Sequence, residues 1–124
     1  MSANSGLSGD LDVSETNIKT KIWVQALVRQ VNGQGAFAVI AHRGDEDAGA
    51  VLVKLYQPGV GATVLTQVRT GDGRRAWMRA TGPEPVPEPD ADRYIERQRD
   101  IDMDLWVVEI EDREGRHPLG DPIL

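Results

Sequence analysis

Four short apolar runs follow one another with glycine-containing turns between them, and this pattern constrains the fold more than any other feature of the chain. The runs occupy residues 36–42, 50–57, 62–69 and 74–81 (AFAVIAH, AVLVKLYQ, ATVLTQVR and RRAWMRAT). Short runs rich in β-branched residues and bounded by glycine are typical of β-strands. Short connections favour antiparallel pairing of neighbours. The spacing therefore predicts an antiparallel meander.

A helix precedes these strands. Trp23, Leu27 and Val31 recur at a spacing of four residues within 19–31, which places them on one helical stripe. Asn32 and Gly33 then supply a left-handed stop. The sequence therefore predicts a helix over 19–31.

A second helix and a last strand follow a proline-rich crossover, GPEPVPEPDAD. Residues 90–101 begin with acidic and end with basic side chains, which matches the helix dipole, and 105–112 (LWVVEIED) form an apolar strand. The predicted order is α-β-β-β-β-α-β. We expect an α+β fold, with a mostly antiparallel sheet of about five strands and two helices on one face.

The chain of 124 residues is long enough for one domain, predicted over 19–117. Residues 1–18 contain small polar and acidic side chains and predict a disordered tail, and 118–124 predict a second tail. The first residues lack the basic and apolar regions of a secretory signal, and no apolar run is long enough to span a bilayer. The absence of cysteine fits a reducing compartment, so we expect a cytoplasmic protein without membrane contact.

Charge is unevenly distributed along the chain. Residues 1–18 carry a net charge of −3, residues 19–81 carry +5 and residues 82–124 carry −8. Such asymmetry marks an interaction surface in some proteins, whereas in others the two halves neutralise each other across one sheet. The sequence leaves both interpretations open.

Several longer motifs resemble a known family. IWVQAL, RGDEDAGAVLVK, WMRATGPEP and YIERQRDIDMDLWVVEIEDREGRH are similar to a small bacterial family known as domain of unknown function 1491. The resemblance covers about residues 19–117. It implies a single compact domain, and it implies no activity, substrate or catalytic residue.

Several chemistries lack the residues that they need. The chain has no cysteine, and its serines all lie within 1–18, so the predicted domain has no serine or cysteine nucleophile. Neither GxxxxGK[ST] nor GxGxxG occurs, so we expect no nucleotide cofactor and no other cofactor. These observations favour a binding module over an enzyme.

The charged stretch HRGDEDAG supplies the alternative site. His42, Asp45 and Asp47 stand close together there, with Glu111 as a further carboxylate, and loops often carry functional residues. The calcium-loop pattern fails because Gly49 stands where the fifth-position ligand is needed, and one histidine is too few for a zinc site. A charged turn explains the stretch without a metal. An enzymatic or metal-assisted role for this loop is kept as the alternative function.

The preferred site is a sheet surface. Arg75, Trp77 and Arg79 alternate along one strand and therefore share a face, and Glu109 and Glu111 share a face of the last strand. If the two faces coincide, they form a surface for a protein partner or a homodimer, with Trp77 partly exposed. Cross-strand pairing of arginine with glutamate is the simpler explanation. A pI near 4.8 disfavours nucleic acid as the partner.

Overall fold

The computed structural model describes residues 19–116, 119–121 and 123–124. Two helices and five strands follow one another in the predicted α-β-β-β-β-α-β order, and each begins and ends within two residues of its predicted bounds. In chain order they are α2 (Thr20–Gly33), β2 (Phe37–His42), β3 (Val51–Gln57), β4 (Gly61–Arg69), β5 (Arg75–Arg79), α3 (Glu88–Ile101) and β6 (Trp106–Glu111). The α+β class is therefore confirmed.

The sheet has the strand order β2-β6-β3-β4-β5. Strands β3, β4 and β5 form the predicted antiparallel meander, but β2 does not pair with β3. Instead β6 lies between them, antiparallel to β2 and parallel to β3. Its neighbouring residues Val107 and Val108 are both buried, and a strand that is apolar on both faces is stable only inside a sheet with both faces covered.

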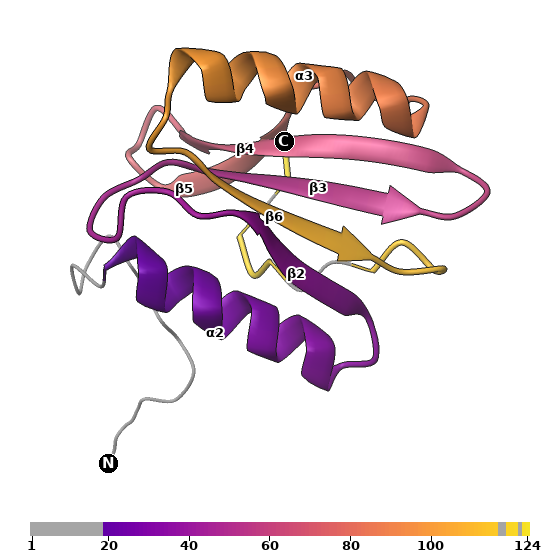
Figure 1. Cartoon of the computed structure of the whole chain (residues 1–124), viewed down its shortest axis with the longest axis horizontal. Coiled ribbons are helices and arrows are strands. Elements are labelled where there is room, and N and C mark those ends of the chain that lie inside the picture. Colours follow the sequence, from indigo (N-terminus) through magenta and orange to yellow (C-terminus); the bar gives the residue numbers. More distant parts are fainter. Residues whose placement is uncertain (1–18, 117–118, 122) are drawn as a thin grey trace.

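The two helices pack on opposite faces of the sheet, which corrects the prediction that they share one face (Figure 1). Val53 and Val108 face α2, whereas their neighbours Leu52 and Val107 face α3. The central strands thus present apolar side chains on both sides, and each side needs its own cover.

Each helix covers only half of its face. Helix α2 packs on β2 and β6, and α3 packs on β3 and β4. The rest of the α2 face is filled in part by the chain beyond β6, where Leu119 is buried in the core and Ile123 lies beside Trp77. Leu119 and Ile123, which belong to the predicted C-terminal tail over 118–124, therefore contribute to the core. The predicted tail over 1–18 lies outside the described residues.

Both edges of the sheet are occupied in part. On β2, the side-chain amide of Asn32 donates to the Ala38 carbonyl (3.2 Å) and accepts from the Ala38 N–H (2.8 Å). On β5, the Leu124 N–H donates to the Trp77 carbonyl (2.8 Å). Contacts of this kind protect a sheet edge from pairing with another chain.

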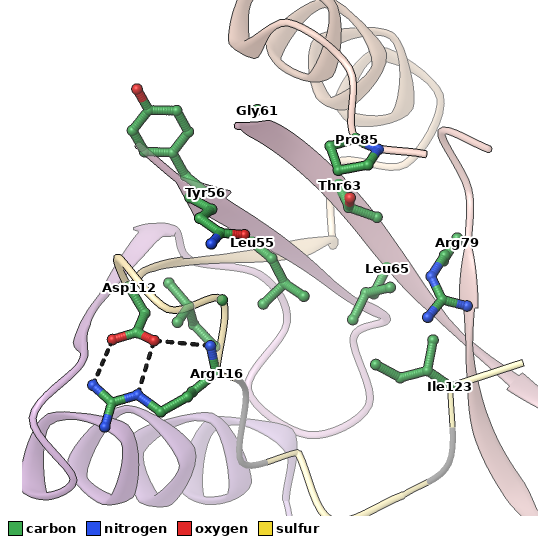
Figure 2. A pocket seen from close by; sticks show the side chains of 13 residues that line it. Leu55, Tyr56, Gly61, Thr63, Leu65, Arg79, Pro85, Asp112, Arg116 and Ile123 are labelled. Carbon is green, nitrogen blue, oxygen red and sulfur yellow. Dashed lines mark hydrogen bonds and ion pairs between the residues drawn. The ribbon is translucent and has the colours of Figure 1, made fainter. Parts of the chain in front are cut away.

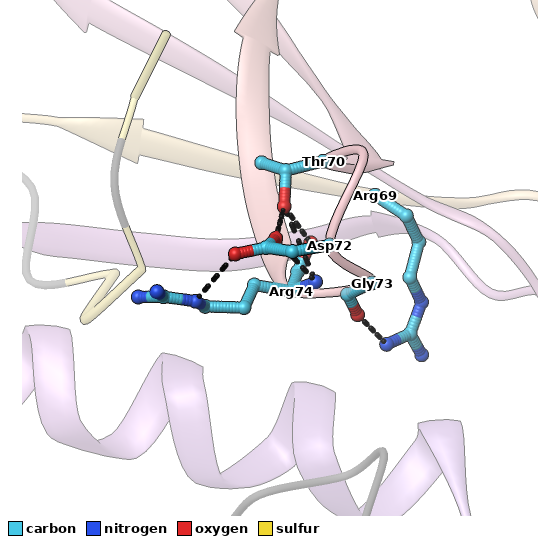
Figure 3. Close-up of polar contacts among 5 residues, drawn as sticks. All are labelled: Arg69, Thr70, Asp72, Gly73 and Arg74. Carbon is cyan, nitrogen blue, oxygen red and sulfur yellow. Dashed lines mark hydrogen bonds and ion pairs between the residues drawn. The ribbon is translucent and has the colours of Figure 1, made fainter.

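The turn between β4 and β5 is tied together by its own side chains (Figure 3). Asp72 accepts hydrogen bonds from the Thr70 hydroxyl and from Arg74, and these bonds lower the pKa of its carboxyl. The Arg69 guanidinium donates to the Gly73 carbonyl (2.9 Å). Two of the arginines that make this half of the chain basic are therefore engaged in local contacts.

Candidate functional site

The structure divides the predicted surface between the two faces of the sheet. Arg75, Trp77 and Arg79 lie on the α2 face, because Arg79 is opposite Leu65 of the α2-side core. Glu109 and Glu111 lie on the α3 face. The two groups do not meet, so the predicted five-residue surface does not form.

Trp77 is fully buried, so the prediction that it is partly exposed is wrong. Its ring stacks on Trp23 of α2 with 6.1 Å between centroids. Arg75 lies over the Trp23 ring, 5.6 Å from its centroid, and Arg79 donates to the Leu124 carbonyl. On the other face of this strand Met78 is exposed, because α3 stops short of β5 there.

The HRGDEDAG loop forms the N-terminal cap of α2. No side chain caps this helix. Instead the N–H groups of Thr20 and Lys21 donate to the carbonyls of Asp47 (3.3 Å) and Glu46 (3.0 Å). The two acidic side chains also lie near the positive end of the helix dipole, where negative charge is favourable. The charged stretch therefore has a structural role.

The alternative site residues are engaged within the same region. The Asp45 carboxylate accepts from the N–H groups of Asp47 (3.1 Å) and Ala48 (2.9 Å), and its carbonyl accepts from the Trp106 indole (2.7 Å). His42 donates from Nδ1 to the Leu105 carbonyl (2.8 Å), since a carbonyl can only accept. Among the described residues, no three acidic or histidine side chains are arranged to hold a metal ion. A catalytic role for the loop stays a prediction.

We expect Gly49→Ala to destabilise the protein by about 1–3 kcal/mol, because an added Cβ overpacks the loop. That Cβ would clash with the Asp104 carbonyl oxygen and lie 2.8 Å from Cδ1 of Trp106. Urea denaturation measures the change. Gly71→Ala is the matched control, because a Cβ at Gly71 meets nothing within 4 Å. Equal stability of both variants would show that the loop is not packed against β6.

A small pocket opens on the α2 face beside the Asp112–Arg116 ion pair (Figure 2). Its apolar lining includes Leu55, Leu65 and Ile123, and its volume is about 160 Å³. Pockets for small-molecule ligands usually measure about 300–1,000 Å³. The pocket is therefore too small for a typical ligand.

The Asp112 carboxylate at this pocket is buried and strongly paired. It accepts from Arg116 Nη2 (2.7 Å), Nε (2.9 Å) and backbone N–H (2.8 Å). The Arg116 guanidinium and backbone amide hold the pKa of the Asp112 carboxyl well below its usual range. A depressed pKa means that ionised Asp112 stabilises the fold above its unfolded pKa of about 3.9, and that this contribution is lost as pH falls further.

We therefore expect Asp112→Asn to lower the melting temperature at pH 7, with a smaller difference from wild type at pH 3. Thermal melts of both proteins across this range measure the difference. Glu114→Gln is the control, because Glu114 is exposed and lies 3.7 Å from Arg116. If the melting temperatures of Asp112→Asn and wild type differed by the same amount at every pH, this result would contradict the lowered pKa of Asp112.

A larger hollow than this pocket lies on the half of the α3 face that α3 leaves open. Two adjoining depressions share Glu109, and the larger measures about 320 Å³. We call their union the α3 groove. Its lining comprises Phe37, Val39, Ala41, His42, Tyr56, Glu88, Asp92, Arg93, Ile95, Glu96, Arg99, Val107, Glu109, Ile110 and Glu111.

Apolar side chains are exposed along β2 at this groove. Phe37 is 59% exposed and Val39 is 37% exposed. The register places them beside Glu111 and Glu109 of β6, on the same face. Two neighbouring apolar residues on an uncovered sheet face mark an interaction surface more often than isolated ones do.

A buried lysine organises the acidic side of the groove. Lys54 of β3 is 2% exposed, and its ammonium donates to Glu88 (2.8 Å) and Asp92 (2.7 Å), with Glu109 at 4.0 Å. Burial alone would lower the pKa of Lys54, but the hydrogen bonds to Asp92 and Glu88 outweigh it, so the pKa is raised. Lys54 is therefore a charged structural centre and has no free electron pair for nucleophilic attack.

Sequence reasoning placed Glu109 and Glu111 in a binding surface but missed the residues around them. The signal was present in two places. Lys54 interrupts an otherwise apolar strand, and Glu88, Asp92 and Glu96 are spaced four apart and therefore lie along one side of α3. A charge inside an apolar strand calls for opposite charges on the element that covers it.

Comparisons with known proteins identify relatives. A family model described as "Protein of unknown function (DUF1491)" matches residues 18–120. The crystal structure of a DUF1491 family protein from Caulobacter crescentus CB15 is 48% identical, with a TM-score of 0.78, and the match covers 86% of this chain and 98% of that chain. An NMR structure of a DUF1491 family protein from the same organism is 47% identical, with the same TM-score, and the match covers 88% of this chain and 98% of that chain.

A more distant solution structure, of protein Atu0922 from A. tumefaciens, is 28% identical with a TM-score of 0.66 and covers 78% of this chain and 87% of that one. No functionally curated protein matches the chain. Within the described residues, no helix is both long and apolar enough to cross a membrane.

Proposed function

We propose that this chain, which belongs to the DUF1491 family, is a protein-binding module that docks a partner in the α3 groove. The observation that carries the proposal is the uncovered half of the α3 face, where Phe37 and Val39 are exposed side by side. Apolar anchors surrounded by polar groups are the usual centre of a protein interface. The absence of cysteine supports a partner in the reducing cytoplasm.

The charge of the groove favours a different protein over a second copy of the chain. In a twofold dimer, a surface patch on one copy contacts the identical patch on the other copy. Such a contact would bring Glu109 and Glu111 of each copy close to the same carboxylates of the other copy, and like charges at an interface are costly.

Recognition through side chains fits the groove better than addition of a strand. The Asn32 side chain occupies the Ala38 N–H and carbonyl on the β2 edge. A partner strand could not form its ladder there without displacing this amide. The partner segment therefore lies across the face of β2 and β6.

We expect replacement of Phe37 and Val39 by serine to weaken partner binding by about 2 kcal/mol or more, as loss of an interface hot spot does. Peptides selected from a random displayed library on the wild-type protein supply the ligands, and calorimetry compares their affinities. Met78→Ser is the matched control, because Met78 is also an exposed apolar residue on a strand (45%) but lies outside the groove.

Two results would contradict the proposal. Selected peptides that bind the Phe37→Ser/Val39→Ser variant as tightly as wild type would place the binding surface elsewhere. A wild-type dimer on a sizing column, converted to monomer by the same variant, would show that the groove serves self-association.

A further inference from the structure

We infer that the segment bound by the α3 groove is basic, with lysine or arginine side chains that enter between α3 and β6 and an apolar side chain that packs on Phe37 and Val39. This inference rests on the proposed function and specifies its partner. It follows from the number, position and pairing of the charges that line the groove.

Carboxylates line the groove on two sides. Glu88, Asp92 and Glu96 follow one another at four-residue spacing along the side of α3 that faces β6. Strand β6 adds Glu109 and Glu111 opposite them. A cleft in which one sign of charge predominates attracts the opposite sign and raises its local concentration.

The cations in the groove leave much of this charge unbalanced. The Lys54 ammonium is shared by Glu88, Asp92 and Glu109. Arg93 is paired with Asp90, outside the groove lining, and Arg99 lies at the end that contains His42. Glu96 and Glu111 make no ion pair with any described residue.

Lys54 also leaves acceptor oxygens in place for a ligand. It binds Oε2 of Glu88 and Oδ1 of Asp92, so the second oxygen of each carboxylate is not used by the lysine. The two side chains are 40% and 54% exposed and are therefore within reach of a second donor. A carboxylate held in one position by a buried cation loses less entropy when it accepts a further hydrogen bond.

The apolar and acidic parts of the groove lie next to each other. Phe37 is in register with Glu111, and Val39 is in register with Glu109. A bound segment that places an apolar side chain on β2 can therefore place its cations on β6 and α3. A phosphate-bearing partner such as a nucleic acid would meet like charge along the same walls.

Titration of the ¹⁵N-labelled full chain with three synthetic peptides tests the inference. The peptides have equal length and alternate leucine with lysine, glutamine or glutamate. We expect the lysine peptide to shift the backbone amide signals of Phe37, Val39, Glu109 and Glu111, and to bind about 10-fold or more tightly than the glutamine peptide. Raised salt should reduce this preference, because the charges are partly exposed.

The variant Glu96→Gln/Glu111→Gln should remove most of the preference for the lysine peptide. Neither residue pairs with Lys54, so the fold should keep its melting temperature. Glu46→Gln is the control, because Glu46 is an exposed carboxylate of the α2 cap, away from the groove.

The outcomes separate this inference from the proposed function. If the glutamine peptide shifts the same amides with equal affinity, the groove binds a segment without selecting for basic charge, and only the inference is overturned. If none of the three peptides shifts these signals, the inference is overturned as well, and the library selection on Phe37→Ser/Val39→Ser decides the proposed function independently.

Discussion

Replacement of Trp77 by alanine is expected to destabilise the protein by about 3–5 kcal/mol. The side chain is completely buried on the α2 face of β5 and stacks on Trp23. Its removal leaves a cavity where β5, α2 and the chain end meet, and it also ends the aromatic contact. Urea denaturation monitored by circular dichroism measures the loss.

Met78→Ala is the matched control for Trp77→Ala. Met78 is the next residue on the same strand and is 45% exposed, so its truncation is expected to change stability by about 0.5 kcal/mol or less. A stable Trp77→Ala variant, together with ready quenching of Trp77 fluorescence by soluble quenchers, would contradict the buried position.

The double substitution Glu88→Gln/Asp92→Asn is expected to lower the free energy of unfolding by about 3 kcal/mol. It leaves the Lys54 ammonium buried, with only the Glu109 carboxylate, at 4.0 Å, to balance its charge. Lys54→Met removes the buried charge itself and keeps the apolar length of the side chain. Its effect is expected to be far smaller, since replacement of a buried ionic group by an apolar one is often neutral. Chemical denaturation of the variants compares them.

The direction in which pH changes the stability provided by the Lys54 ion pairs can also be predicted. The pKa of Lys54 is raised in the folded protein, so the ion pairs stabilise the fold fully below the unfolded value of about 10.4 and lose their effect as pH rises through the folded value. Wild type should therefore lose more stability than Lys54→Met above this pH. Equal losses would show that the pKa of Lys54 is not raised in the folded protein.

The bounds of the helices and strands could be predicted because they depend on local pattern. The turns at residues 58–60 and 70–74 contain glycine, and the strands beside them carry β-branched and apolar residues. The stripe of Trp23, Leu27 and Val31 is buried as the helical spacing predicts. Each of these features is decided by residues close together in the chain.

The sequence did not allow the same kind of prediction for the face of the sheet on which each side chain lies. Trp77 and Met78 alternate on β5, and parity alone does not say which of them faces the better-covered side. The answer depends on α2 and on the chain near Ile123, which lie far away in the sequence. The predicted contact surface failed for this reason, whereas Glu109 and Glu111 remain in the groove.

The charged loop was ambiguous for a different reason. As residue types, Asp45, Glu46 and Asp47 suit both a metal site and a charged turn. Only the tertiary fold shows that the backbone carbonyls of this loop meet the N–H groups of Thr20 and Lys21. Helix α2 begins without a capping side chain, and here a distant segment supplies the acceptors.

The position of β6 between β2 and β3 has a consequence for how the chain folds. The antiparallel hairpins of β3, β4 and β5 join residues close in sequence, but β2 and β3 are connected only through a strand that begins at Trp106. During synthesis, β2 and the inner edge of β3 therefore lack their partner until most of the chain has left the ribosome. Closure of the sheet is then a late, non-local step, which slows folding and leaves strand edges exposed to other chains in the meantime.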